Sequence, residues 1–144
     1  MNQDNGAYSL IGYQLKRAQA ALRSRMDDEL RPLGLTTPQY SCLEALSHSP
    51  GASNSDLARA VFVTRQTMSA LLHSLEARGL VERADRAPGG RAIPTSLTSE
   101  GQALLTEAAR GSERIEQRMV ATLTPSQMEA LRSGLAACVE ALVE

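Results

Sequence analysis

An expected helix between Thr64 and Gly79 carries, on one face, polar side chains that could form hydrogen bonds with another macromolecule. At about 100° per residue, Leu71, Leu72 and Leu75 fall within about 60° of Met68, and the four form one apolar stripe. The opposite face carries Gln66, Ser69, Ala70 and His73, with Arg65 at its start. Small residues let a helix enter the major groove of DNA, where Gln, Ser, Arg and His can bond base edges or phosphates. An ordinary solvated helix face has the same composition, so the angles alone leave both interpretations open.

Three arginines that follow this helix could contact the same partner. Arg83, Arg86 and Arg91 bracket Pro88-Gly89-Gly90, a sequence typical of the tip of a β-hairpin. Guanidinium groups on a narrow projection can enter the minor groove of DNA, where the electrostatic potential is most negative. The segment 56–98 carries six arginines against four acidic residues, whereas the whole chain has a net charge of -1. This charge pattern predicts a small anion-binding surface on a neutral body, and the alternative is a network of ion pairs among loop charges.

Two short helices joined by a turn must position the polar face. The capping box Ser53-Asn54-Ser55-Asp56 predicts the start of the first of them. Thr64 is expected to cap the second, and Gly79 is expected to end it. The pattern then indicates two strands of a hairpin, Leu80 to Arg83 and Ala92 to Ser96. Two helices followed by a hairpin form a winged helix-turn-helix.

Longer helices are expected on both sides of this motif. One covers about residues 8–31, and another, capped by Thr98, continues to about Leu123. Thr124-Pro125-Ser126-Gln127 is a second capping box, and its helix carries an apolar seam: Met128, Leu131, Leu135, Cys138 and Leu142. These helices hold more apolar surface than one small lobe can cover, so the seam predicts a partner. A short helix capped by Thr37, with Pro38 at its first position, completes a mostly α fold.

The length and composition are those of one ordinary globular domain. The chain has 144 residues, of which 42% are hydrophobic and 22% charged, and this excludes a disordered or collagen-like protein. No apolar run reaches the roughly 18 residues of a membrane span, and Met1 to Gly6 lacks a signal pattern, so a cytoplasmic protein without membrane contact is expected. His48 and His73 are the only histidines, and no GxSxG, P-loop, GxGxxG or HExxH motif is present, which argues against an enzyme.

Two cysteines are further candidate reactive groups. Cys42 and Cys138 lie far apart and outside any CxxC or Cys/His cluster, so no disulfide, zinc site or other cofactor is expected. Cys42 falls in an apolar helical repeat, and Cys138 falls in the terminal seam. Both are expected to be buried and structural, and a thiol that senses oxidants is the alternative.

A series of ordered motifs runs through the chain. They are Ser55-Asp56-Leu57-Ala58, Thr64, Met68, Leu72, Leu75-Glu76, Arg78-Gly79-Leu80-Val81, Asp85-Arg86, Arg91, Leu97-Thr98 and Gly101. Together with the flank 32–40, they resemble the MarR family of bacterial transcription regulators over nearly the whole chain. The departure is the wing, where the family's common Asp-Arg-Arg run is broken into Asp85-Arg86-Ala87-Pro88-Gly89-Gly90-Arg91. This leaves open which arginine enters the minor groove.

The resemblance implies a winged helix-turn-helix with a two-stranded β wing, plus a helical dimerisation region built from both termini. It implies an N-terminal dimerisation helix in 1–34, a DNA-binding lobe in 35–98 and C-terminal dimerisation helices in 99–144. It also implies a homodimer on a palindromic operator in double-stranded DNA, with half-sites roughly 34 Å apart. The predicted DNA-binding residues are Ser53, Ser55, Thr64, Arg65, Gln66, Thr67, Ser69, Ala70, His73, Arg83, Arg86 and Arg91.

A ligand-controlled repressor is the function that the resemblance implies. Family members commonly release DNA when a small phenolic or aromatic acid binds between the dimer region and the winged lobe. The predicted effector-binding residues are Tyr13, Arg17 and Tyr40, which offer an apolar wall and a cation for a carboxylate. Packed tyrosines and a solvated arginine are the alternative for these three. The alternatives for the whole protein are an oxidant-sensing regulator of the same fold and a winged-helix module that binds proteins without specific DNA binding.

Overall fold

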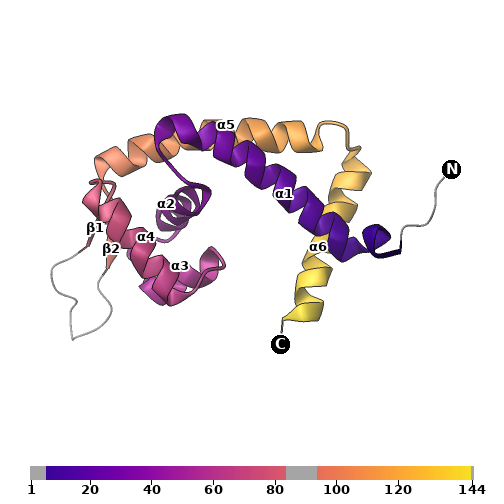
Figure 1. The fold of residues 1–144 in the computed structure, drawn as a ribbon, viewed down its shortest axis with the longest axis horizontal. Coiled ribbons are helices and arrows are strands. Elements are labelled where there is room, and N and C mark those ends of the chain that lie inside the picture. The colour runs from indigo at the N-terminus through magenta and orange to yellow at the C-terminus, as the bar shows by residue number, and fades with distance from the viewer. Residues whose placement is uncertain (1–5, 84–93, 144) are drawn as a thin grey trace. The chain divides into compact units, whose positions relative to one another are not determined.

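The computed structural model describes residues 6–83 and 94–143, and these are mostly α-helical, as the sequence predicts (Figure 1). The α-helices are α1 (Ile11–Leu30), α2 (Thr37–His48), α3 (Asn54–Ala60), α4 (Arg65–Ala77), α5 (Ser99–Val120) and α6 (Pro125–Leu142). Short 3-10 helices, η1 (Gly6–Ser9) and η2 (Arg31–Leu33), flank α1, and β1 (Val81–Arg83) pairs with β2 (Thr95–Leu97). The order α3, α4, β1, β2 is that of a winged helix-turn-helix, which confirms the predicted fold class. The chain divides into two compact units, one ending at Ser112 and the other beginning at Glu113.

Side-chain caps begin most helices at the residues that the sequence indicates. They are Ser53 before α3, Thr64 before α4, Thr98 before α5 and Thr124 before α6. Each of these hydroxyl groups accepts a backbone N–H from the first turn, which has no partner within the helix. Short polar sequences therefore fix where these helices begin.

The cap of α2 differs from the prediction by one residue. Thr36 has an extended backbone, and its Oγ1 accepts the N–H of Gln39 at 3.2 Å, while Gln39 Oε1 accepts the N–H of Thr36 at 3.0 Å. A capping box needs the hydroxyl three residues before the glutamine, and Thr36 rather than Thr37 has that spacing. Thr37 is the first helical residue instead, and its hydroxyl donates to Asp27 of α1 at 2.6 Å.

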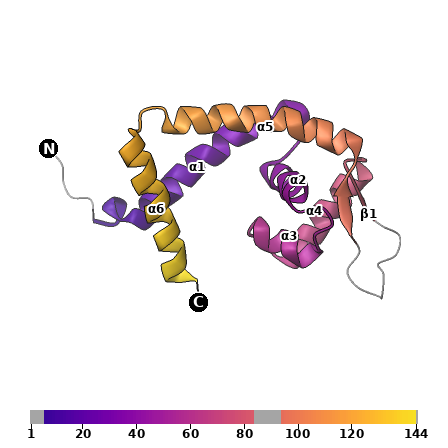
Figure 2. The same ribbon diagram turned by 180° about the vertical axis from the view of Figure 1, so that it is seen from behind.

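The core of the first unit lies among α2, α3, α4 and the sheet, which pack against one another (Figure 1, Figure 2). Its fully buried side chains include Leu43 and Leu46 of α2, Leu57 of α3, Met68, Leu72 and Leu75 of α4, and Val81 and Thr95 of the sheet. Three of the four apolar residues predicted to face the core from α4 are among them, and Leu71 is half-buried. One apolar stripe on each helix is sufficient to build this core.

The sheet is short and antiparallel. Val81 lies opposite Leu97, and Arg83 lies opposite Thr95. The second strand begins at Thr95, and Pro94 precedes it, since a proline has no N–H to give to the strand ladder; residues 92 and 93 of the predicted strand lie outside the described residues.

Helix α5 begins very close to the sheet. A Cβ atom on Gly101 would lie 1.9 Å from the Leu80 carbonyl oxygen. Only a glycine allows this approach, which sets the direction of α5 relative to β1.

The second unit, residues 113–143, contains the end of α5 and all of α6. Helix α5 ends at Val120, three residues before the predicted end at Leu123. No residue of α6 is buried, and the seam residues Leu131 and Leu135 are exposed. Cys138 is exposed as well, contrary to the expectation that it would be buried. Across residues 6–83 and 94–143, no helix is long and apolar enough to cross a membrane.

Candidate nucleic-acid interface

The turn between α3 and α4 determines how α4 is presented. Val63 N–H donates to the Ala58 carbonyl oxygen at 3.0 Å and closes the turn. Phe62 has a φ of 62°, in the left-handed region that bulky residues rarely adopt, and its side chain is 93% exposed. Thr64 follows with an extended backbone and caps α4. The turn therefore holds one strained residue and delivers α4 with a capped N-terminus.

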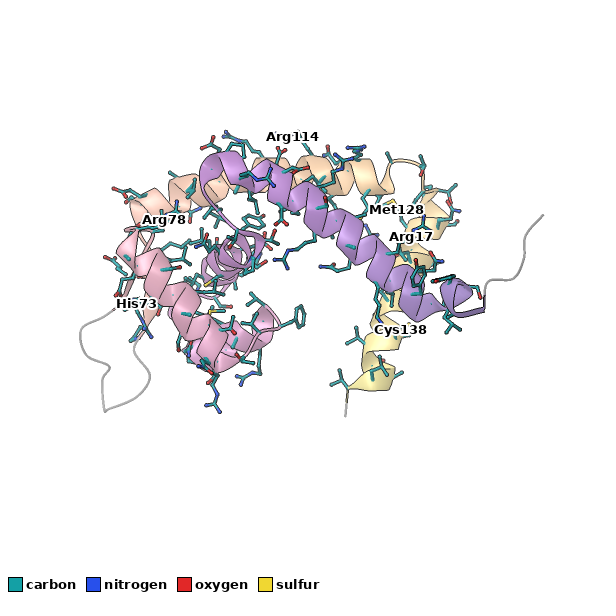
Figure 3. The ribbon with its side chains drawn as sticks, in the orientation of Figure 1. Arg17, His73, Arg78, Arg114, Met128 and Cys138 are labelled. Carbon is teal, nitrogen blue, oxygen red and sulfur yellow. The ribbon has the colours of Figure 1, made fainter. Side chains whose placement is uncertain are left out.

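Helix α4 has one buried and one exposed face. The exposed residues include every predicted groove residue of this helix: Arg65, Gln66, Thr67, Ser69, Ala70 and His73. His73 projects from α4 on the side away from α2 (Figure 3). Because Met68, Leu72 and Leu75 are fully buried behind them, the exposed side chains stand on a helix held rigidly by the core.

The fold already uses several of the hydroxyl groups predicted to contact DNA. Ser53 Oγ accepts the N–H of Asp56 at 3.1 Å. Thr64 Oγ1 accepts the N–H of Thr67 at 3.1 Å and donates to Thr67 Oγ1 at 3.0 Å. Ser53 and Ser55 are half-buried. Ser53 and Thr64 therefore act first as helix caps, whereas the Thr67 side chain stands exposed on α4.

Asn54 belongs to this surface and was not predicted from the sequence. Its side-chain nitrogen donates to the Arg65 carbonyl oxygen at 3.3 Å and to Ser69 Oγ at 3.0 Å. These bonds join the first residue of α3 to the first turns of α4. An asparagine at the start of a helix is common, so its type and position gave no signal of a contact 15 residues away.

The wing is described only at its base. Arg83 is half-buried at the end of β1, and its Nε is buried with no hydrogen-bond partner among the described residues. Arg86, Arg91 and the expected Pro88-Gly89-Gly90 tip lie outside those residues. The assignment of these arginines to the minor groove stays a prediction.

The three predicted effector-binding residues do not converge within one chain. Tyr13 stacks edge-on against Tyr8, with ring centroids 4.9 Å apart, and Arg17 is exposed on the next turn of α1. Tyr40 is instead buried near the other end of α1, where Thr37 bonds to Asp27. The 14 residues from Tyr13 to Asp27 span about 21 Å of helix.

The Tyr40 hydroxyl has hydrogen-bonding partners within its own chain, Glu44 of α2 and Ser112 of α5. It donates to Glu44 Oε2 at 2.7 Å. Burial, together with this hydrogen bond, raises the pKa of Tyr40 to about 12. Tyr40 is therefore a neutral hydrogen-bonding group at physiological pH and can contribute ring surface to a ligand site.

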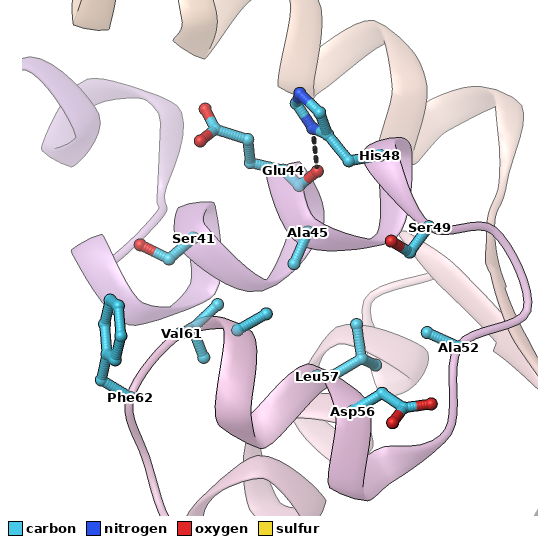
Figure 4. A pocket seen from close by; sticks show the side chains of 11 residues that line it. Ser41, Glu44, Ala45, His48, Ser49, Ala52, Asp56, Leu57, Val61 and Phe62 are labelled. Carbon is cyan, nitrogen blue, oxygen red and sulfur yellow. Dashed lines mark hydrogen bonds between the residues drawn. The ribbon is translucent and has the colours of Figure 1, made fainter. Parts of the chain in front are cut away.

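A cavity of about 460 Å³ lies between α2 and α3 (Figure 4). None of the three predicted effector residues lines it. Three of its polar residues have partners in the chain: Glu44 accepts from Tyr40, His48 Nδ1 lies 2.9 Å from the Glu44 carbonyl oxygen, and Asp56 pairs with Arg59. Hydrogen bonds from Ser53, with the nearby Arg59 charge, lower the pKa of Asp56. Two carboxylates on its wall make this cavity unfavourable for an aromatic acid.

The two cysteines differ in environment. Cys42 is fully buried, with Sγ 3.6 Å from Met68 Sδ, and burial raises the pKa of its thiol to about 11. The expected burial of Cys42 is confirmed, and a buried neutral thiol favours a structural role over oxidant sensing. Cys138 is exposed in the single chain. No group of three or more His, Cys, Asp or Glu residues in the described part of the chain could hold a metal ion.

The family of the chain follows from its similarity to known proteins. Residues 33–92 match the sequence model of the MarR family. The HTH-type transcriptional repressor Rv2887 of Mycobacterium tuberculosis is 42% identical over 120 residues, which are 83% of this chain and 86% of that protein. The chain belongs to the MarR family.

Solved structures agree with this assignment to the MarR family. Rv2887 in complex with DNA has a TM-score of 0.72 and 36% identity, over 90% of this chain and 98% of that one. Rv2887 with salicylic acid has a TM-score of 0.71 and 38% identity, over 90% and 96%. The transcriptional repressor CouR, bound to a 23-mer DNA duplex, has a TM-score of 0.85 and 31% identity, over 96% and 99%. Rv2887 and CouR are both transcriptional repressors.

Proposed function

We propose that this MarR-family chain is a transcriptional repressor that binds operator DNA through α4. The observation that carries the proposal is the exposed face of α4, from Arg65 to His73, which stands opposite a fully buried apolar stripe. A rigid helix with exposed Gln, Ser and Arg side chains fits the major groove. The DNA complexes of Rv2887 and CouR support this function. The proposed contacts are Ser53, Ser55, Thr64, Arg65, Gln66, Thr67, Ser69, Ala70 and His73, with Arg83, Arg86 and Arg91 from the wing.

The proposed functional unit is a homodimer. Residues 1–34 and 99–144 would form the dimerisation region and residues 35–98 the DNA-binding lobe. Large apolar side chains are exposed at the N-cap and along the first half of α1 and along α6: Leu10, Ile11, Tyr13, Leu15, Leu131, Leu135, Val139 and Leu142. A stable protein covers apolar surface of this extent, and a second copy of the same helices can do so. A two-fold dimer would present two α4 helices to the half-sites of a palindromic operator, roughly 34 Å apart.

We also propose that a small aromatic or phenolic ligand releases the DNA. The salicylic acid complex of Rv2887 supports this class of ligand. Arg17 supplies an exposed cation for a carboxylate, and Tyr13 supplies an exposed ring. Since both lie far from Tyr40 within one chain, a site that uses all three would have to combine α1 of one subunit with α2 of the other.

A DNA-binding titration tests the proposed function. The purified full-length chain is titrated against DNA from its own upstream region at two salt concentrations, with and without salicylate. Tight binding that weakens with salt, together with protection of a palindrome, is the expected result. Gln66→Ala tests the exposed face of α4 by removing one of its proposed DNA contacts. Ser74→Ala is the control on the same helix, because Ser74 lies on the part of α4 that bonds to Gln39 of α2.

The outcomes separate the parts of the proposal. No sequence-specific binding at either salt concentration would contradict DNA recognition and favour a protein-binding module. Specific binding that salicylate leaves unchanged would contradict the aromatic-acid effector and leave the repressor assignment standing. Specific binding by a protein that sediments as a monomer would contradict the homodimer.

A further inference from the structure

We propose that Asn54 is a positioning residue for base recognition, because it fixes the Ser69 hydroxyl as a hydrogen-bond donor directed toward DNA. This role rests on the proposed DNA-binding function and adds a determinant of which base is recognised. Asn54 itself would not contact a base. It would act through the orientation of Ser69, which is exposed on the α4 face.

The orientation of the Asn54 amide follows from its partners. The Arg65 carbonyl oxygen, 3.3 Å from Asn54 Nδ2, can only accept a hydrogen bond. A rotated amide would set two acceptor oxygens against each other, so the nitrogen must face α4. Nδ2 carries two hydrogens, and the second reaches Ser69 Oγ at 3.0 Å. Ser69 is therefore the acceptor in this pair.

The other end of the same amide indicates that this arrangement has a function. Asn54 Oδ1 is buried and has no hydrogen-bond partner among the described residues. A buried acceptor without a partner destabilises a fold, and native proteins retain few of them. The cost of the buried Asn54 oxygen is explained if the two N–H bonds from Asn54 to α4 serve DNA recognition as well as stability.

The same bonds remove the usual acceptor for the Ser69 hydroxyl proton. A serine within a helix commonly donates to the carbonyl four residues earlier, which for Ser69 is that of Arg65. That oxygen has two lone pairs, of which the helix uses one for the Ser69 backbone N–H and Asn54 uses the other. In the part of the chain that the structure describes, no side chain or carbonyl takes the Ser69 proton. It is left for a partner outside the chain.

A donor at this place on α4 selects bases that offer an acceptor in the major groove. Guanine presents two acceptors there, O6 and N7, whereas cytosine presents the N4 amino donor. We therefore expect one position in each half-site at which guanine, with two acceptors for the Ser69 proton, is preferred over cytosine. Thymine O4 and adenine N7 would rank between them.

The test compares base preference in the full-length wild-type protein and in five variants. Binding is measured on operators that carry each of the four bases at each half-site position. Asn54→Ala, Ser69→Ala and the double variant remove the two groups singly and together. Ser74→Ala makes the same chemical change on the face of α4 that bonds to α2, and Asp56→Ala weakens the start of α3 without touching Ser69. Thermal unfolding of each variant is recorded in parallel.

Ser69→Ala and Asn54→Ala should each reduce the preference for guanine at the same position by about fivefold, the factor expected for one hydrogen bond. Asn54→Ala should have no further effect on that preference in the Ser69→Ala background, because both residues act through one hydroxyl. Ser74→Ala and Asp56→Ala should leave the preference unchanged even where they lower the unfolding temperature.

Three results would overturn the role of Asn54 while the proposed function stands. In the first, Asn54→Ala keeps the full preference although Ser69→Ala loses it. In the second, Asp56→Ala loses the same preference, which would attribute the effect to a loosened α3. In the third, Ser69→Ala weakens binding equally on all sequences, which would place the hydroxyl on a phosphate. A wild-type protein without any base preference would contradict the proposed function itself.

Discussion

The winged lobe and the long helix α6 use the same helical periodicity in opposite ways. In the lobe, the apolar stripe of α4 meets those of α2 and α3 from the same chain, and Met68, Leu72 and Leu75 are fully buried. In α6, an equally regular seam has no buried residue. The difference teaches that a stripe at helical spacing predicts a covered face but not which chain covers it. The described part of the lobe builds its core within one chain, whereas the proposed dimer would cover the α6 seam.

The largest expected contrast comes from truncating one leucine in each region. Leu72→Ala leaves a cavity in a packed core and should lower the free energy of unfolding by about 2–5 kcal/mol at any protein concentration. Leu135→Ala truncates an exposed seam residue and should instead weaken dimerisation. Chemical denaturation at several protein concentrations measures both effects.

The dependence on protein concentration decides this comparison. Loss of stability in Leu135→Ala that is the same at all concentrations would show that the seam is covered within its own chain. Equal dimer affinity in Leu135→Ala and wild-type protein, measured by sedimentation equilibrium, would contradict the proposed homodimer interface.

The sequence predicted the elements of the fold because their signals are local. Hydroxyl caps and helical stripes lie within a few residues of each other, so the helix-turn-helix and the split of α4 into two faces could be derived. The exposure of Cys138 in the single chain could not be derived, because an apolar seam predicts a covered face but not which chain covers it. The pairing of Asn54 with Ser69 could not be derived either, because only the packing of α3 on α4 brings them together.

A smaller contrast is expected between two glycines. At Gly101 an added Cβ would lie 1.9 Å from the Leu80 carbonyl oxygen, so Gly101→Ala must displace backbone and should cost about 1–3 kcal/mol. At Gly134 of α6 nothing lies within 4 Å of an added Cβ, and Gly134→Ala should stabilise the helix by up to about 1 kcal/mol. Thermal unfolding of both variants measures the difference. Destabilisation by Gly134→Ala would indicate that the partner subunit packs tightly at that position.

Helix caps should behave alike in both regions, because a cap acts within one turn. Ser53→Ala in the lobe and Thr124→Ala before α6 each remove a hydroxyl from a capping box, and each should lower the free energy of unfolding by about 1 kcal/mol. Denaturant titration at one fixed protein concentration measures both, with Thr98→Ala as a third cap for comparison. A loss at Thr124 far above that at Ser53 would show that the start of α6 also makes contacts across the dimer.

The smallest effect on stability is expected for a test of thiol reactivity, which compares Cys42 of the lobe with Cys138 of α6 without altering the core. Burial raises the pKa of Cys42 to about 11, so this thiol stays protonated in the native protein at neutral pH. The contribution of the neutral thiol to the free energy of unfolding is therefore complete below its ordinary pKa of 9.0 and is lost as the pH rises through about 11. At pH 8, a disulfide reagent should therefore modify Cys138 in the dilute native protein and Cys42 only after unfolding. Raising the protein concentration should slow the reaction of Cys138, because the proposed dimer covers the α6 seam. Cys138→Ser removes the fast phase in this experiment, and fast labelling that persists in that variant would show that the lobe opens around Cys42.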